Sequence, residues 1–235
     1  MVHQLNGLVV HALDSAILLA SHSMQAPELI HLRRLVHRTN TGILAHSGVT
    51  DPVRIVLSHA TGLPIMAVPP AAVELSGTEV VLHLPDDADD SVHLAGSLEP
   101  IDPRNDADAD LWMVHHQTPE YPRMARLTVD LARRVDLVID GPEVFVPPAL
   151  SLGAIGRAVR RVNADERRLL DLCERLALVR PEAARCVNAD AFGLSIRARF
   201  GVLRVEFDPE QPPATTDEAL DGAVSRLLGG LGGPV

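Results

Sequence analysis

Two adjacent histidines, His115 and His116, follow the single tryptophan of the chain, Trp112, shortly after an acidic stretch at 99–110. Imidazole is a common axial ligand of heme iron, so either ring could bind a heme. We expect residues 111–116 to form a short strand, in which adjacent side chains point to opposite faces. Only one of the two histidines could then face a pocket. The alternative is a half-exposed surface histidine without a ligand.

A second pair of histidines, His83 and His93, belongs to two expected strands joined by a short acidic loop. The two rings could face each other across the strand pair and hold a metal. Two imidazoles without a third ligand make a poor metal site, so we expect none. The carboxylates within 86–90 lack the ordered spacing and the glutamate of a calcium-binding loop. We expect His59 to be a turn residue.

Arginines are dense between residues 157 and 168. Arg157, Arg161 and Arg168 share one side of the helix expected there, and a carboxylate, a heme propionate or an RNA phosphate could dock on them. The alternative is a solvated helix face balanced by nearby acidic residues. The sequence contains no nucleophile elbow, phosphate-binding loop, zinc quartet or catalytic-triad motif. The candidate cofactor-binding residues are therefore His115, His116, Arg157, Arg161 and Arg168, and we expect no catalytic residue.

The composition limits the classes of function. The 235-residue chain is 46% hydrophobic, enough for a globular core, and its formal net charge of -10 argues against binding to nucleic acid or an anionic membrane. All 21 cationic side chains are arginine, which excludes Schiff-base chemistry on lysine. The two cysteines, Cys173 and Cys186, fit buried thiols in a reducing cytoplasm better than a redox pair. The apolar segment 7–20 is too short to span a membrane and lacks the preceding Lys or Arg of a secretory signal, so we expect a cytoplasmic protein.

Residues 1–150 are expected to form one domain built mainly from short strands. An apolar opening at 1–25 is followed by a helix expected from Pro27 to Arg38, and short apolar runs separated by turn residues follow it. Many short strands at a spacing of about 8–12 residues are typical of a barrel or a sandwich. The expected strands are 43–46, 53–59, 65–68, 73–75, 80–84, 92–98 and two or three within 127–145, before a connecting segment at 147–156.

Residues 151–235 are expected to form a second domain of helix, three strands and helix. Apolar spacing predicts a helix over 161–178, with Asp165 capping its start, and a last helix after Thr216. The strands are expected at 185–188, 194–199 and 202–207. Alternation along them predicts a sheet with one apolar face, covered by the two helices, and one charged face.

Several stretches carry a resemblance to a known family. Asn163-Ala164-Asp165 resembles the start of an N-A-D-H motif in a small C-terminal domain, the turn at 188–194 resembles its D-x-x-G-hydrophobic pattern, and Gly201–Phe207 resembles its G-x-x-x-R-v-x-F strand. Ser91–Pro100 is similar to the R-v-x-l-x-G-x-l-x-P strand of split barrels related to pyridoxamine-phosphate oxidases. HugZ-type heme-utilisation proteins and the plastid glutamyl-tRNA-reductase-binding protein combine the two domains, and actinobacterial proteins of unassigned function share this layout. The resemblance covers about residues 40–230.

The resemblance implies an α+β fold, with an N-terminal split β-barrel (FMN-binding-like) followed by a small α-β-β-β-α domain, and it implies a homodimer. Two departures matter for function. The family's motif histidine is Glu166 here, and all 11 histidines lie between His3 and His116. The nearest equivalent of an FMN-phosphate cluster, 39–41 with Arg33, Arg34 and Arg38, is better explained as the end of a helix, so we expect no FMN.

These observations favour a non-enzymatic binding protein linked to heme or tetrapyrrole metabolism, with a protein partner in that metabolism. A heme-degrading or flavin-type oxidoreductase is one alternative. It requires an axial ligand in the barrel or a phosphate clamp. A dimeric interaction module with no small ligand is another.

Overall fold

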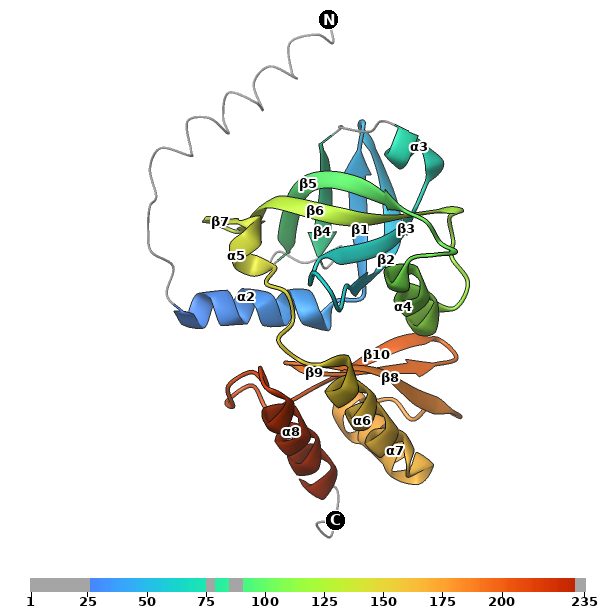
Figure 1. The fold of residues 1–235 in the computed structure, drawn as a ribbon, viewed down its shortest axis with the longest axis vertical. Coiled ribbons are helices and arrows are strands. Elements are labelled where there is room, and N and C mark those ends of the chain that lie inside the picture. The colour runs from blue at the N-terminus through green and yellow to red at the C-terminus, as the bar shows by residue number, and fades with distance from the viewer. Residues whose placement is uncertain (1–25, 75–78, 85–90, 231–235) are drawn as a thin grey trace, which may run out of the picture. The chain divides into compact units, whose positions relative to one another are not determined.

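Figure 1 shows the chain as a computed structural model, which describes residues 26–74, 79–84 and 91–230. The first described element is helix α2 (Ala26–Arg38), which confirms the helix expected from Pro27 to Arg38. Its side chains Leu32, Leu35 and Val36 are buried. The segment 7–20, the acidic loop at 86–90 and the last five residues lie outside the described residues. No helix in the described part of the chain has the length and apolar character needed to cross a bilayer.

Six antiparallel strands form a closed barrel. Their order is β3-β2-β1-β4-β5-β6, and the ring closes because β3 also pairs with β6. A seventh strand, β7 (Leu137–Asp140), pairs with the end of β6. Alternate side chains of the strands fill the interior with aliphatic residues, as the sequence pattern predicted. The six barrel strands are β1 (Thr41–His46), β2 (Val49–Leu57), β3 (Pro64–Val68), β4 (Val80–Leu84), β5 (Val92–Ile101) and β6 (Arg123–Arg134).

A glycine allows the longest strand pair to approach closely. The register of β5 and β6 shifts at a bulge between Ala95 and Gly96. A Cβ atom on Gly96 would lie 1.9 Å from the carbonyl oxygen of Thr128, so a larger residue would push the strands apart. Gly96 is the glycine of the strand motif by which this sequence resembles split barrels.

Three segments expected as strands are helices. Residues 73–75 fall largely in α3 (Pro70–Glu74), residues 111–116 in α4 (Ala107–His116), and the last apolar run before residue 147 in α5 (Gly141–Val144). Asp106 caps α4 by accepting a hydrogen bond from the backbone N–H of Asp108. Acidic residues in a first turn favour a helix, and this signal was taken for an acidic loop.

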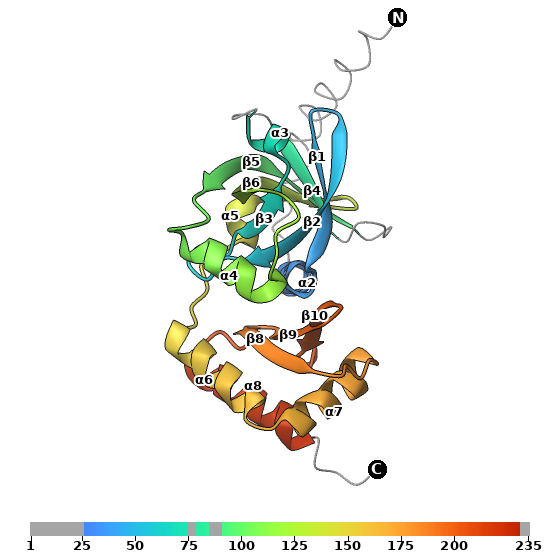
Figure 2. The ribbon, with the colours of Figure 1, turned by 90° about the vertical axis from the view of Figure 1, so that its right-hand side faces the viewer.

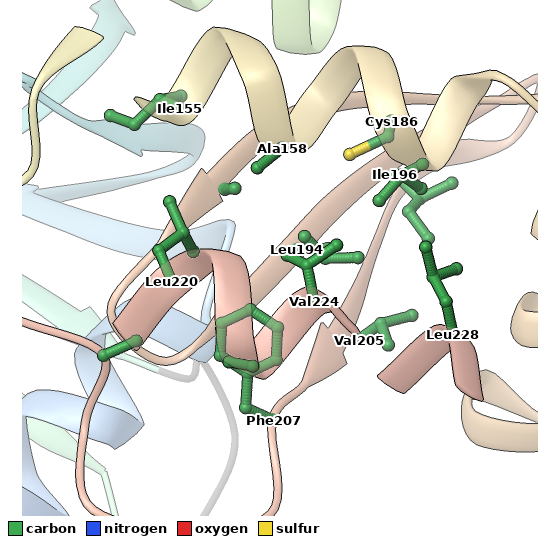
Figure 3. Close-up of a cluster of buried hydrophobic side chains, with 14 of the residues drawn as sticks. Ile155, Ala158, Cys186, Leu194, Ile196, Val205, Phe207, Leu220, Val224 and Leu228 are labelled. Carbon is green, nitrogen blue, oxygen red and sulfur yellow. The ribbon is translucent and has the colours of Figure 1, made fainter. Parts of the chain in front are cut away.

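The C-terminal part contains a three-stranded antiparallel sheet in the order β10-β9-β8. The strands are β8 (Ala184–Asp190), β9 (Gly193–Ala198) and β10 (Gly201–Glu206), close to their expected positions. Helices α6 (Leu152–Asn163), α7 (Glu166–Ala177) and α8 (Asp217–Gly229) cover one face of this sheet (Figure 2). Figure 3 shows the core between them, where Ile155, Ala158, Leu220 and Val224 face side chains of the strands.

The expected single helix over 161–178 is two helices. Helix α6 begins within the expected connection at 147–156, where Ser151 caps it by accepting from the N–H of Ala154, and it ends at Asn163. Asp165 then caps α7 by accepting from the N–H of Arg168, as predicted for a helix start. Gly153 and Gly156 lower the helix propensity of α6, which explains why its first turns were missed. The fold class is confirmed as α+β with a split-type barrel, whereas the domain boundary at residue 150 stays a prediction.

Candidate functional site

His115 and His116 lie in the last turn of helix α4 rather than on a strand. Both are buried, with 3% and 9% of their surface exposed, so neither is a surface histidine. His116 Nε2 lies 2.9 Å from the carbonyl oxygen of Ile55, and its ring packs against Trp112. His115 Nδ1 lies 2.9 Å from the carbonyl oxygen of Leu111, one helical turn earlier. Each ring is therefore held by a backbone carbonyl.

These hydrogen bonds determine which nitrogen of each ring carries the proton. A carbonyl oxygen only accepts, so Nδ1 of His115 and Nε2 of His116 are the N–H groups. Burial lowers the pKa of both rings to about 4, although their carbonyl hydrogen bonds act in the opposite direction. His115 is thus a neutral imidazole with its lone pair on Nε2. That nitrogen is buried and has no hydrogen-bond partner in the described part of the chain.

A buried carboxylate anchors the other end of α4. Asp108 accepts hydrogen bonds from Ser58 Oγ at 2.8 Å and from Arg126 Nη2 at 2.6 Å. Ser58 directly follows β2, and Arg126 belongs to β6, so both tie the first turn of α4 to the barrel. Arg126 Nη1 also donates to Glu99 on β5 at 3.2 Å. The position of His115 therefore depends on a helix whose first turn is bonded to β6 and to the residue that follows β2.

Two arginines satisfy the free carbonyl groups at the C-terminal end of α4. Arg54 of β2 donates to the carbonyl oxygens of His116 and Thr118, at 3.3 and 2.7 Å. Arg197 of β9 donates to the carbonyl oxygen of Val114 at 2.6 Å. Positive charge is favourable at this end of a helix dipole. The same contacts bring the second sheet against α4.

A cavity of about 560 Å³ lies beside this end of α4. We call it the His115 pocket. Three arginines and one glutamate contribute to its wall, which favours an anionic ligand. Phe200, at the turn between β9 and β10, adds an aromatic ring that is 59% exposed. The side chains used below are His115, His116, Gln117, Arg197, Arg199 and Phe200.

The backbone is strained at the wall of the His115 pocket. Gln117, which ends α4, has φ 67° and ψ -86°. A residue with a Cβ atom rarely adopts this conformation, and such strain often occurs at functional sites. The strained residue is two positions from His115.

A smaller cavity, of about 30 Å³, also borders His115 and is lined by charged groups. Arg204 Nη2 donates to Asp190 Oδ1 at 2.6 Å, and His37 Nδ1 lies 3.3 Å from Asp190 Oδ2. Burial alone would raise the pKa of Asp190, but the neighbouring Arg204 and His37 hold it well below its usual range. Asp190 is therefore ionised and paired.

The charged face of the three-stranded sheet is not open to solvent as the alternation suggested. Helix α4 packs beside β9 and β10 on this face. Asn188 Oδ1 lies 2.9 Å from Nε2 of His59, which sits in the turn expected for it. Ser195, also on this face, is only 9% exposed. Polar residues of this face therefore contact residues of the segment that contains the barrel strands.

The predicted arginine site is not part of this arrangement. Arg157 and Arg161 are on α6, on the opposite face of the sheet, whereas Arg168 is exposed on α7 after the helix break. Arg157 Nη2 lies 3.9 and 3.8 Å from carboxylate oxygens of Asp217 and Asp221. Arg161 donates to Ser225 Oγ at 2.8 Å, also on α8. Two of the three arginines thus join α6 to α8.

The candidate phosphate cluster is also engaged with protein groups. Arg33 Nη2 donates to the carbonyl oxygen of Glu143, and Thr39 Oγ1 donates to the carbonyl oxygen of Leu35. Arg34 donates to the carbonyl oxygen of Phe207 at 3.4 Å. These bonds fit the interpretation of this segment as a helix end.

The remaining pairs are the histidines of β4 and β5 and the two cysteines. His83 and His93 face each other across β4 and β5. Cys173 and Cys186 are both buried and form no disulfide. Burial raises the pKa of the Cys186 thiol to about 12, which makes it a poor nucleophile. Across residues 26–74, 79–84 and 91–230, no group of three or more His, Cys, Asp and Glu side chains is arranged to hold a metal.

Comparison of the sequence with protein-family profiles and with curated protein sequences finds no match. Solved structures do resemble it. A protein of unknown function from Agrobacterium tumefaciens is 17% identical, with a TM-score of 0.64 over 89% of this chain and 99% of its own. This similarity supports the fold. A heme-binding protein from Mycobacterium smegmatis is 21% identical, with a TM-score of 0.40 over 88% of this chain and 98% of its own.

Proposed function

We propose that this chain is a non-enzymatic binding protein that holds a heme, or a closely related metallated tetrapyrrole, in the His115 pocket. The single observation that carries the proposal is the buried, neutral imidazole of His115, whose Nε2 has no partner among the described residues. When bound, a heme supplies an iron atom with an open axial position, which a neutral imidazole can occupy.

His115 has the features of an axial ligand. Histidines that bind metals usually donate their second N–H to a carbonyl or a carboxylate, which fixes the tautomer and the ring orientation. The Leu111 carbonyl oxygen provides this contact for His115. His116 differs, because its Nε2 is already bonded to the Ile55 carbonyl oxygen. The proposal therefore assigns the ligand role to His115 and a packing role to His116.

The pocket also offers partners for the carboxylates of a tetrapyrrole. Arg197 and Arg199 both line it, and Arg199 is exposed. Guanidinium groups bind carboxylates through paired, charge-assisted hydrogen bonds. The exposed ring of Phe200 supplies an apolar surface for a flat ligand. A volume of about 560 Å³ is within the range of small-molecule pockets.

Ligand binding requires a local opening. His115 Nε2 is buried in this structure, so the last turn of α4 or the β9–β10 turn has to move before a metal can reach it. Strain at Gln117 lowers the free energy needed for such a movement. The proposed binding is therefore slower than diffusion and coupled to a rearrangement of residues 115–118.

The test is a hemin titration of the purified full chain, followed by absorbance in the Soret region. The wild-type protein is expected to give a saturable, shifted Soret band. His115→Ala should lose the shift, whereas His115→Met should give a different spectrum because a thioether replaces the imidazole. His116→Asn is the matched control and should retain the wild-type spectrum. Thermal unfolding of each variant verifies the fold.

The absence of a saturable shift in the wild-type protein, or an equal shift in a folded His115→Ala variant, would refute the proposal. Arg197→Gln and Arg199→Gln separate carboxylate binding from metal ligation. Each is expected to weaken binding at least about tenfold with an unchanged band position, the loss typical of one charge-assisted hydrogen bond. Consumption of bound heme after addition of a reductant would instead favour the oxidoreductase alternative.

A homodimer remains a separate prediction, together with the alternative of an interaction module without a small ligand. Met113 and Val114 on α4 are 41% and 46% exposed. The carbonyl oxygen of Val114 accepts a hydrogen bond from Arg197. Light scattering with and without hemin tests the oligomeric state. A stable dimer whose mass is unchanged by hemin, in a protein that gives no Soret shift, would favour the interaction module.

A further inference from the structure

Contrary to the expectation from the sequence, we propose that His83 and His93 together form a binding site for a divalent transition-metal ion, preferentially Cu²⁺ and more weakly Ni²⁺. This site is independent of the His115 pocket. It lies on the outer side of the barrel wall, because the intervening and flanking residues Leu82, Leu84, Val92 and Leu94 point into the buried interior.

The strand register places the two imidazoles directly opposite each other. His83 and His93 are partners in the antiparallel ladder of β4 and β5, and their ring centroids are 4.5 Å apart, with 67° between the ring planes. A metal–nitrogen bond of about 2.0–2.1 Å places an imidazole centroid about 3.2 Å from the metal. When two imidazoles bind one ion with a right angle between the two metal–nitrogen bonds, their centroids are about 4.5 Å apart. When the angle between the bonds is tetrahedral, the centroids are about 5.2 Å apart.

The centroid distance thus matches two adjacent positions of a square-planar or tetragonal ion. Cu²⁺ and Ni²⁺ prefer this geometry with nitrogen ligands, and Zn²⁺ prefers a tetrahedral site. Copper also forms the most stable complexes of the divalent first-row metals. Both rings are partly exposed, so water can fill the remaining positions around the ion.

The hydrogen bonds of the pair leave nitrogen atoms available. Ser91 Oγ lies 2.9 Å from His93 Nε2. With Nε2–H as the donor to Ser91 Oγ, Nδ1 of the same ring carries the lone pair that a metal needs. Burial lowers the pKa of both histidines, so both rings are neutral at pH 7. Arg133 on β6 is the register neighbour of His93 and opposes a cation. It is exposed, so solvent screens its charge.

The test is a Cu²⁺ titration of untagged full-length protein, followed by electron paramagnetic resonance and by competition with a chelator. A His3→Ala background is used throughout, so that this histidine cannot contribute to the Cu²⁺ signal. We expect one equivalent of Cu²⁺ with nitrogen hyperfine structure from two imidazoles. His83→Ala and His93→Ala should each weaken binding at least about tenfold, as expected when a ligand is removed.

His31→Ala is the matched control, because His31 is an exposed histidine on α2 outside the pair. It should leave the affinity and the spectrum unchanged. Arg133→Gln should tighten binding by a few fold, because it removes a repulsive charge. Unchanged Cu²⁺ affinity in a folded His83→Ala or His93→Ala variant would overturn the proposal. A signal from one imidazole only in the parent protein would overturn it equally.

Discussion

The side chain of Asn163 forms hydrogen bonds with both backbone polar groups of Cys186. Its Oδ1 accepts from the N–H of Cys186 at 2.9 Å, and its Nδ2 donates to the carbonyl oxygen of Cys186 at 2.8 Å. Cys186 lies where the register of β8 and β9 shifts, so its backbone groups need a partner from outside the ladder. The first residue of the N-A-D motif therefore joins the end of α6 to the bulge in β8.

Replacement of Asn163 should destabilise the protein without affecting ligand binding. Asn163→Ala leaves a buried N–H and a buried C=O without their partner, and we expect a loss of about 2–3 kcal/mol in the free energy of unfolding. Asn163→Asp retains the acceptor but sets a carboxylate against the Cys186 carbonyl oxygen, so it should not restore stability. Urea denaturation measures both variants, and a loss below about 0.5 kcal/mol in Asn163→Ala would contradict this role.

Acid should destabilise the protein in the pH range between the unfolded and folded pKa values of His115 and His116. The pKa of His115 and of His116 is about 4 in the folded chain, against an ordinary value of 6.5. Between these values the unfolded chain binds more protons, so the free energy of unfolding falls as the pH decreases from 6.5 to 4. Each ring contributes up to about 3 kcal/mol to this loss.

His115→Phe tests this effect, because it removes one titrating ring and keeps an aromatic side chain of similar size. The dependence of unfolding free energy on pH between 6.5 and 4 should become about half as steep. An unaltered slope in His115→Phe would show that His115 is already protonated or accessible in the folded state.

Gln117→Gly should stabilise the free protein. Glycine adopts a positive φ without the clash that Gln117 experiences at 67°. We expect a gain of about 1 kcal/mol, equivalent to a rise of about 2–4 °C in the melting temperature. If the opening proposed above uses this strain, the same variant should slow hemin uptake in stopped-flow measurements. Destabilisation by Gln117→Gly would indicate that the side chain is needed at this position.

Asp190 and Arg204 should be strongly coupled. Their side chains are 20% and 9% exposed, and removal of one partner leaves the other charge largely buried. Asp190→Asn and Arg204→Gln are each expected to cost about 2–4 kcal/mol, and the double variant less than the sum. A double-mutant cycle by chemical denaturation measures the coupling energy. Additive losses would mean that His37 or water replaces the missing partner.

The sequence predicted the parts of the fold in which one face of an element is buried and the other is polar. Apolar and polar residues alternate regularly along β4 and β5. The pattern therefore predicted the positions of both strands and that His83 and His93 face each other. Thr216 caps α8 by accepting from the N–H of Ala219, as its position before an apolar stripe indicated. In such elements, local propensity and burial favour the same structure.

Helix α4 was missed because it packs on two sides. Trp112 and His116 contact the barrel, and His115 is buried as well, which leaves little of the polar–apolar periodicity that reveals a helix. The pocket was missed for a different reason. Its residues come from segments far apart in the chain, such as His115 and Arg199, and no spacing rule relates them. The only local signal was the row of polar residues on β9, which suggested a solvated face.

Closure of the barrel through β3 and β6 has a consequence for self-association. A strand with neighbours on both sides offers no edge to which a strand of another molecule can add. Among the described strands, β7, β8 and β10 end their sheets. Asn40 Nδ2 already donates to the carbonyl oxygen of Val202 on β10 at 2.6 Å. Amyloid-type or donor-strand pairing of this protein would therefore start at β7 or β8 and not at the barrel wall.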